Sequence, residues 1–175
     1  MRVIAGTLGG RTFDSPHNAR THPMSDKIRG ALFNTLGDIE DLTVLDAFAG
    51  SGALCFEAIS RGAQHAYAIE NDKSAQRAIA ANITALGLAD QVTLAATSAS
   101  SWLAANLDQQ FDIVLLDPPY DNVQPELIQQ LAATVKPDGI MVLSWPGDQT
   151  LPSFGQFGLV MSRSYGDAQL AYYQR

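Results

Sequence analysis

The sequence lacks several features that would place it in a specialised class of protein. Cys55 is the single cysteine among 175 residues, which excludes an intramolecular disulfide and a metal site built from several cysteines. No apolar run approaches the roughly 18 residues of a membrane-spanning helix, and the first residues lack the apolar core of a signal peptide. The histidines, His17, His22 and His65, are scattered without metal-ligand spacing. We therefore expect a monomer of the reducing cytosol, without metal or membrane contact, in which Cys55 is a packed thiol.

Positive charge is also scarce, and its distribution is uneven. The chain holds 11 Lys and Arg against 18 Asp and Glu, a net charge of −7, which by itself argues against a nucleic-acid partner. Residues 1–30, however, carry five basic and two acidic residues, whereas residues 31–175 carry six and sixteen. This basic segment on an acidic body is either a local phosphate-binding patch or an ordinary polar terminus.

Hydrophobic periodicity indicates an alternation of helices and strands after an N-terminal hairpin. Residues 1–16 alternate apolar and polar side chains around Gly9 and Gly10, which predicts a small β-hairpin. A helix should begin at Ser25 or Asp26 and end at Gly37. Further helices are expected over 52–62, 72–87, 99–107 and 124–135, between strands over 42–48, 65–70, 91–96, 111–117 and 139–145.

This βα alternation is typical of a parallel sheet with helices on both faces. Residues 157–174 instead read as two strands joined near Tyr165 and Gly166, an antiparallel hairpin at the sheet edge. The fold class is therefore α/β and Rossmann-like, with a mostly parallel sheet of seven strands. We divide the chain into a basic N-terminal extension over residues 1–24 and a main domain over residues 25–175.

A glycine loop after the strand over 42–48 is the expected cofactor site. Asp46 lies at the carboxyl end of that strand and is followed by Gly50 and Gly52, and ligands of such sheets bind outside the strand ends. Glu70 ends the next strand and suits a ribose diol. A dinucleotide site is the alternative, but Cys55 stands where its third glycine belongs, and Asp46 would repel a pyrophosphate. The carboxylate of Asp46 suits the cationic amino-acid end of S-adenosylmethionine.

The remaining predicted cofactor contacts are less distinctive. Phe48 belongs to the same loop, and Asn71 follows Glu70 directly. The strand over 91–96 is followed by no acid, so Ser98 or a backbone amide is expected to contact the adenine. Trp102 is expected in the core.

The stretch Asp117-Pro118-Pro119-Tyr120 ends a buried strand with unusual chemistry. It is either a proline-rich turn with a solvated carboxylate, or a site for an exocyclic base amine. In the second interpretation Asp117 and the carbonyl of Pro118 accept the two N–H groups and stabilise developing positive charge. Tyr120 stacks on a base removed from its helix, worth about 1–3 kcal/mol. The preceding glycine loop and Glu70 favour the catalytic interpretation.

Several stretches together resemble the RsmD-type bacterial methyltransferases. They are MRVIAGTLGGRTF, HPMSDKIRGALFNTLG, LDAFAGSGALCFEAISRGA, FDIVLLDPPY and the late RSYGD, which run nearly end to end. The resemblance implies a Rossmann-like class I methyltransferase that modifies a guanine N2 amine of 16S ribosomal RNA with S-adenosylmethionine. It implies cofactor roles for Asp46, Gly50, Gly52 and Glu70, and catalytic roles for Asp117, Pro118 and Tyr120.

The basic N-terminal segment is where the resemblance implies RNA contact. His22 and Met24 depart from the family element R-P-T-[ST]-D-[RK]-[VI]-[RK], and Gly30 stands where an acid is common. The strand over 139–145 lacks an acid that many relatives carry at its end, so we assign no role there. With so few cations we expect the substrate to be 16S RNA within a small-subunit particle rather than an isolated fragment. The expected RNA-binding residues are Arg2, Arg11, Arg20, Lys27 and Arg29.

Two other functions fit the same residues. A DNA adenine-N6 or other base-amino methyltransferase would use the same acceptor geometry, although the chain has no obvious room for a target-recognition insertion. A non-catalytic RNA-binding or assembly protein would retain the fold without the reaction.

Overall fold

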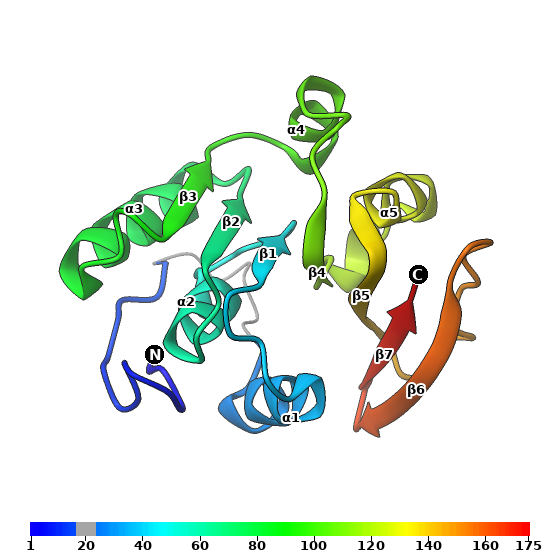
Figure 1. Cartoon of the computed structure of the whole chain (residues 1–175), viewed down its shortest axis with the longest axis horizontal. Coiled ribbons are helices and arrows are strands. Elements are labelled where there is room, and N and C mark those ends of the chain that lie inside the picture. The colour runs from blue at the N-terminus through cyan, green and yellow to red at the C-terminus, as the bar shows by residue number, and fades with distance from the viewer. Residues whose placement is uncertain (17–23) are drawn as a thin grey trace.

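A computed structural model describes residues 1–16 and 24–175 as a single sheet between two helical layers (Figure 1). The sheet has the order β3-β2-β1-β4-β5-β7-β6. All neighbours pair in parallel except β7, which is antiparallel to both β5 and β6. The predicted fold class is therefore confirmed, including the antiparallel hairpin at the edge. The strands are β1 (Thr43–Asp46), β2 (His65–Ile69), β3 (Val92–Ala95), β4 (Phe111–Leu116), β5 (Val135–Pro146), β6 (Gly158–Tyr165) and β7 (Ala168–Gln174).

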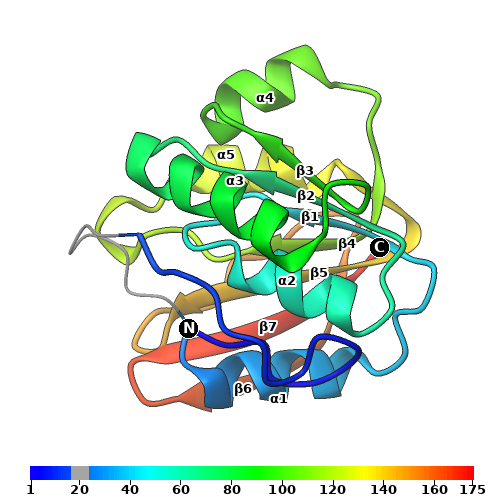
Figure 2. The same cartoon turned by 90° about the vertical axis from the view of Figure 1, so that its left-hand side faces the viewer.

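Helices cover the two faces of the sheet unequally (Figures 1 and 2). One face carries α1 (Asp26–Leu36), α2 (Ala53–Ser60) and α3 (Lys73–Leu86), and the other carries α4 (Ala99–Ala105) and α5 (Pro125–Ala132). Alternate residues of β4 divide between the two cores, with Ile113 and Leu115 on the first side and Val114 and Leu116 on the second. Within the described ranges no helix is both long and apolar enough to cross a membrane.

The first helix begins and ends where its sequence predicts. The Ser25 hydroxyl accepts a hydrogen bond from the Ile28 amide at 3.3 Å, and Gly37 ends the helix with a φ of 76°. Leu32 and Phe33 are buried against the sheet. The same helix also buries Arg29 completely, which the apolar pattern did not predict.

The fifth strand begins earlier than expected. The helix predicted over 124–135 ends at Ala132, and β5 already starts at Val135. The buried hydroxyl of Thr134 donates to the Leu131 carbonyl, and the Thr134 carbonyl accepts from the Phe111 amide at the start of β4. These bonds end the helix and recruit the chain into the sheet, so local helix propensity loses to strand pairing.

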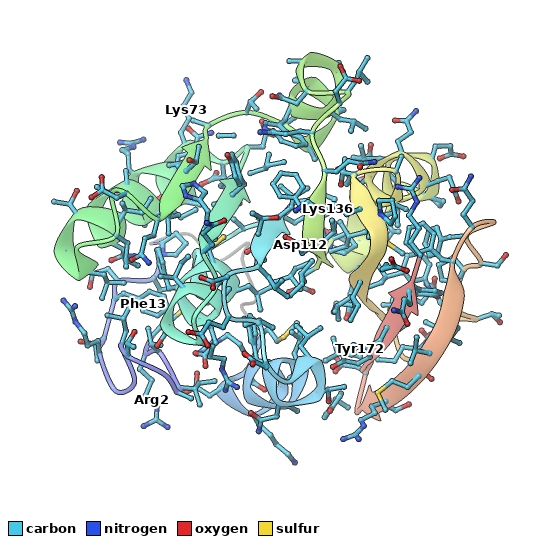
Figure 3. The ribbon with its side chains drawn as sticks, viewed as in Figure 1. Arg2, Phe13, Lys73, Asp112, Lys136 and Tyr172 are labelled. Atoms are coloured by element: carbon cyan, nitrogen blue, oxygen red, sulfur yellow. The ribbon has the colours of Figure 1, made fainter. Side chains whose placement is uncertain are left out.

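A partly buried polar contact joins the starts of three neighbouring strands, at the sheet edge where the parallel strands begin. Asp112 of β4 accepts from the Thr43 amide at 2.8 Å and from Lys136 Nζ at 2.9 Å (Figure 3). Thr43 belongs to β1 and Lys136 to β5, so one carboxylate fixes the relative position of all three strands.

The N-terminal segment forms a looser structure than the predicted hairpin. An isolated antiparallel bridge joins Arg2 to Thr12, and no regular strand is formed within the described residues 1–16. Its two halves still exchange backbone hydrogen bonds, from the Val3 amide to the Arg11 carbonyl and from the Phe13 amide to the Met1 carbonyl. The amides of Ile4 and Ala5 donate to the Glu57 carboxylate of α2, at 2.7 and 3.2 Å. The segment is therefore attached to α2 and is not a free-standing hairpin.

Charged side chains buried beneath this segment hold it in place. Glu57 and Arg29 have no exposed surface, and their Oε2 and Nε atoms lie 3.9 Å apart. Arg61 Nε donates to Glu57 Oε1 at 2.7 Å. Arg29 in turn donates to the backbone carbonyl of Arg2 at 2.7 Å. Glu57 and Arg29 thus bind backbone groups of the arm, and Arg61 binds Glu57.

We predict that Glu57→Ala lowers the free energy of unfolding by about 3–5 kcal/mol, because it leaves the buried Arg29 guanidinium with the half-exposed Asp26 as its remaining carboxylate and removes the acceptor of two arm amides. Chemical denaturation measures the loss, and amide hydrogen exchange should show faster exchange at Ile4 and Ala5. Glu40→Ala removes an exposed carboxylate and is the control. Equal losses in the two variants would contradict the role given to the buried cluster.

Candidate active site

Two carboxylates meet at the carboxyl edge of the parallel strands. Asp46 is the last residue of β1, and Asp117 directly follows β4, the neighbouring strand. Asp46 pairs with Leu115, so Asp117 lies only two residues beyond the paired position. The two side chains are close enough that the charge of Asp117 raises the pKa of Asp46. The sheet thus brings together residues that lie 71 positions apart in the sequence.

The glycine loop between β1 and α2 has the backbone conformation that the sequence predicted. Gly50 and Gly52 have φ values of 54° and 79°, and a Cβ on Gly52 would lie 2.9 Å from the ring of Phe56. The Gly50 amide donates to Glu70 Oε2 at 2.7 Å, and the Asp72 amide donates to Glu70 Oε1 at 2.6 Å. Glu70 therefore ties the loop to the end of β2.

Asp46 is a buried carboxyl with an unused hydrogen-bonding atom. Its side chain has no exposed surface, and Oδ1 has no partner within the described part of the chain. Oδ2 accepts a long contact of 3.8 Å from the Cys55 thiol. Burial, together with the charge of Asp117, raises the pKa of Asp46 to about 8. The predicted burial of Cys55 is confirmed, and its position beside Asp46 adds a weak donor at the site.

A cationic ligand would suit this carboxyl. It would compensate the buried charge, lower the pKa of Asp46 and give Oδ1 a partner. One sheet edge holds the unpaired Oδ1 of Asp46, the positive-φ glycines of the loop and the Glu70 carboxylate, which accepts two backbone amides. These residues fit the ammonium or sulfonium end of a nucleoside cofactor, and a pyrophosphate would be repelled.

A second group of polar side chains surrounds Asp117. Tyr120, in the short 3-10 helix Tyr120–Asn122, places its hydroxyl 2.7 Å from the Ser144 hydroxyl at the end of β5. Ser144 also lies beside Asp117, because Leu143 and Leu116 pair in the preceding register position. Burial raises the pKa of Asp117, while hydrogen bonding from the neighbouring Ser144 hydroxyl opposes the rise. Pro118, the next residue, is buried, whereas Tyr120 is 38% exposed.

Ser144 is the residue of this site that sequence reasoning missed. The end of the strand over 139–145 received no role, because it lacks the acid expected from the resemblance. The available signal was a lone polar residue at the carboxyl end of an apolar strand, next to the strand that ends in Asp117.

Three further predicted cofactor residues are placed less decisively. Ser98 caps α4, where its hydroxyl accepts from the Ser101 amide at 3.1 Å, so the adenine contact predicted for it would have to share that hydroxyl. Phe48 is half-buried against the second core, and Asn71 is exposed. Their cofactor roles stay predictions.

The structure brings Arg2 to the start of α1, near Lys27, and places Arg11 at the end of α3. Arg2 is exposed and pairs with Asp26 at 3.0 Å, and Lys27 lies on α1 (Figure 3 shows Arg2 at the outer side of the arm). Arg11 donates to the carbonyls of Ala85 and Leu86 at the end of α3.

Arg29 requires a correction, because its buried guanidinium is already occupied by the Arg2 carbonyl at 2.7 Å and the Asp26 carboxylate at 2.9 Å, beside the buried Glu57. Other residues discussed for this element lie outside the described residues: Arg20, His17, His22 and Pro23.

Comparisons with known proteins agree on one family. The model of the family described as Conserved hypothetical protein 95 matches residues 1–174. The Haemophilus influenzae protein named Ribosomal RNA small subunit methyltransferase D is 30% identical over 180 residues, covering 99% of this chain and 93% of that protein. The solved structure of a hypothetical protein from a Thermus species superposes with a TM-score of 0.85 at 30% identity, covering 98% of each chain.

A more distant structural neighbour shows the fold alone. SMU.776, solved in complex with SAH, superposes with a TM-score of 0.69 at 16% identity, covering 85% of this chain and 48% of that one.

We predict that ligand-free protein loses stability relative to Asp46→Asn as the pH rises from about 5 to 8. The folded-state pKa of Asp46 is raised to about 8, so folding favours the protonated form, and its stabilising effect disappears as the pH climbs toward that value. The difference in unfolding free energy between the two proteins should change by up to about 1.4 kcal/mol per pH unit. Urea denaturation across this range measures it. A difference that does not vary with pH would mean that Asp46 titrates normally.

Proposed function

This chain belongs to the Conserved hypothetical protein 95 family, the family of RsmD-type methyltransferases, and we propose that it transfers a methyl group from S-adenosylmethionine to a guanine N2 amine of 16S ribosomal RNA. The observation that carries the proposal is the meeting of Asp117, Ser144 and Tyr120 with the buried carboxyl of Asp46 at one sheet edge. The name of the Haemophilus influenzae relative supports ribosomal RNA of the small subunit as the substrate.

The cofactor half of the site is formed by β1, the glycine loop and β2. S-adenosylmethionine supplies an electrophilic methyl group on a sulfonium when bound. Asp46 faces its cationic amino-acid end, and Gly50 and Gly52 allow the backbone to approach it closely. Glu70 already accepts two backbone amides, which hold its carboxylate in position to receive the ribose hydroxyls with its remaining lone pairs.

The acceptor half is formed by the ends of β4 and β5. An exocyclic amine is a poor nucleophile because its lone pair is delocalised into the base. Asp117 and the Pro118 carbonyl accept its two N–H groups and stabilise the positive charge that develops on nitrogen. The ring of Tyr120 stacks on the target base. Because the pKa of Asp117 is raised, its carboxylate form and therefore the reaction are favoured as pH rises.

RNA recognition is assigned to the basic N-terminal extension, residues 1–24, and to the start of α1. Arg2 is exposed there, and Lys27 lies in the first turn of that helix. Arg2 already has an acidic partner, and Arg11 holds the end of α3, so little free positive charge is available to phosphate. This supports a structured small-subunit particle, which adds shape and protein contacts, as the substrate.

The reaction is tested by incubating the protein with methyl-labelled S-adenosylmethionine and, in parallel, unmodified small-subunit particles, naked 16S RNA and duplex DNA. Digestion to nucleosides and mass analysis should identify N2-methylguanosine, with more product from particles than from naked RNA. N6-methyladenine in DNA would instead establish the base-amino DNA methyltransferase. Cofactor binding without transfer to any substrate would indicate a non-catalytic RNA-binding protein. Strong activity on naked RNA with none on particles would contradict the proposal that the substrate is a small-subunit particle.

Two substitutions should separate the halves of the site. Asp117→Ala should lower kcat by at least about 100-fold, because it removes charge stabilisation at the amine, and should leave the dissociation constant for S-adenosylmethionine nearly unchanged, because Asp46, the glycine loop and Glu70 are retained. Glu70→Ala should raise that dissociation constant about tenfold or more and largely preserve kcat at saturating donor. Isothermal titration calorimetry measures the dissociation constant, and steady-state kinetics with both substrates saturating measure kcat. Glu126→Ala, an exposed residue of α5, is the control.

Unchanged turnover in Asp117→Ala would remove its catalytic assignment. Normal donor affinity in Glu70→Ala would mean that the ribose is held elsewhere.

A further inference from the structure

We propose that Ser144 is a positioning residue that couples the charge-stabilising carboxylate of Asp117 to the stacking ring of Tyr120 through a directed chain of hydrogen bonds. The inference rests on the proposed function, because it concerns how that same site is held. It gives a role to the end of β5, for which the sequence offered none.

Strand pairing places Ser144 where such a link is possible. Leu116 of β4 pairs with Leu143 of β5, so the next residues on the two parallel strands, Asp117 and Ser144, lie side by side. On its other side Ser144 pairs with Leu170 of β7. Only 4% of Ser144 is exposed, which leaves its hydroxyl little access to water. Its partners must therefore be protein groups: the Tyr120 hydroxyl lies 2.7 Å away, and the register places the Asp117 carboxylate next to it on β4.

The number of available hydroxyl protons fixes the direction of the two hydrogen bonds. An ionised Asp117 carboxylate can only accept, so the single proton of the Ser144 hydroxyl is donated to it. The Ser144 oxygen is then the acceptor in its 2.7 Å contact with Tyr120, and the phenol is the donor. Each hydrogen bond polarises the next, which strengthens the bond that reaches the charged end.

This arrangement serves both tasks of the acceptor site. The bond to Asp117 favours its carboxylate against the effect of burial, and so maintains the form that accepts an amine proton. The bond to Tyr120 fixes the hydroxyl end of a residue that is otherwise 38% exposed, and leaves the ring face available for a base. Because both hydrogen bonds involve the same hydroxyl, replacing Ser144 should release the Tyr120 ring and also raise the pKa of Asp117.

The titratable groups beside these hydrogen bonds are acidic. Their charges raise the pKa values of neighbouring acidic groups, whereas the Ser144 hydroxyl lowers those of Asp117 and Tyr120. Asp46 at the end of β1 lies close to Asp117 and in turn experiences the charge of Glu70. Asp117 itself and Asp167, in the turn between β6 and β7, raise the pKa of the Tyr120 phenol, after the larger effect of burial. The Ser144 hydroxyl is therefore the neutral donor that offsets this negative environment.

The first test needs neither cofactor nor RNA. Carbon-13 NMR of the Asp117 carboxyl follows its titration in the free protein. Ser144→Ala should move the midpoint upward by about one pH unit, since it removes a hydrogen bond to a charged group. Ser144→Thr keeps the hydroxyl and should stay close to the wild type. Tyr120→Phe breaks only the distal bond, so its shift should be smaller.

The matched control is Thr134→Ala. Thr134 is another buried hydroxyl, 2% exposed, which donates to the Leu131 carbonyl near the start of β5, at the opposite end of the strand. Its loss is expected to lower stability without moving the Asp117 midpoint. A midpoint shift in Ser144→Ala that the control reproduces would reduce Ser144 to a general packing role and overturn the proposal.

The second test uses methyl transfer at saturating donor, so that titration of Asp46 in cofactor binding does not enter. Ser144→Ala should lower kcat by about tenfold and move the acidic limb of the kcat–pH profile upward with the NMR midpoint. Adding Tyr120→Phe to Ser144→Ala should cost nothing further, because the distal bond is already lost. Independent, multiplicative losses would overturn the coupling.

The two tests distinguish failure of the inference from failure of the function. If the wild-type protein methylates no ribosomal RNA, the proposed function fails, while the NMR titration still decides whether Ser144 controls Asp117. If RNA is methylated and the midpoint and kcat of Ser144→Ala equal those of the wild type, the inference fails and the function stands.

Discussion

Two neighbouring, largely buried carboxyl groups determine the electrostatics at the carboxyl edge of the sheet. Asp46 and Asp117 end neighbouring parallel strands, and burial together with the charge of the second raises the pKa of the first to about 8. Such a pair is unfavourable in the isolated chain, because one oxygen of Asp46 has no partner in the described structure. In the proposed function, a cation beside Asp46 and an amine beside Asp117 would offset this cost.

Helix α2 connects this edge to the segment assigned to RNA. Its first turn follows Gly52 of the cofactor loop, and its buried Glu57 holds the amides of Ile4 and Ala5. One helix therefore contacts both the glycine loop and the arm. Burying Glu57 and Arg29 is costly, and the cost is offset because their hydrogen bonds satisfy backbone groups that would otherwise need strand partners.

The resemblance stated from sequence and the family match agree, and the fold class is confirmed with its edge hairpin. Arg29 was misread as a surface cation, because charged residues are usually exposed and its segment was considered alone. The buried carboxylate of Glu57, 28 residues further along the chain, lies beside it. Backbone hydrogen bonds join the two halves of residues 1–16, as their alternation predicts, and Glu57 attaches this segment to α2 through Ile4 and Ala5.

The order of residues along the chain was enough to say which groups stand at the carboxyl ends of the strands. Alternating strands and helices require parallel pairing, and parallel pairing brings strand ends such as Asp46, Glu70 and Asp117 to one edge whatever the details of packing. The identity of the side chains that complete the site came from contacts between separate strands. The register sets Ser144 beside Asp117, and a turn brings Tyr120 back onto Ser144. Periodicity could not reveal either contact, because it records the face of a residue but never its partner.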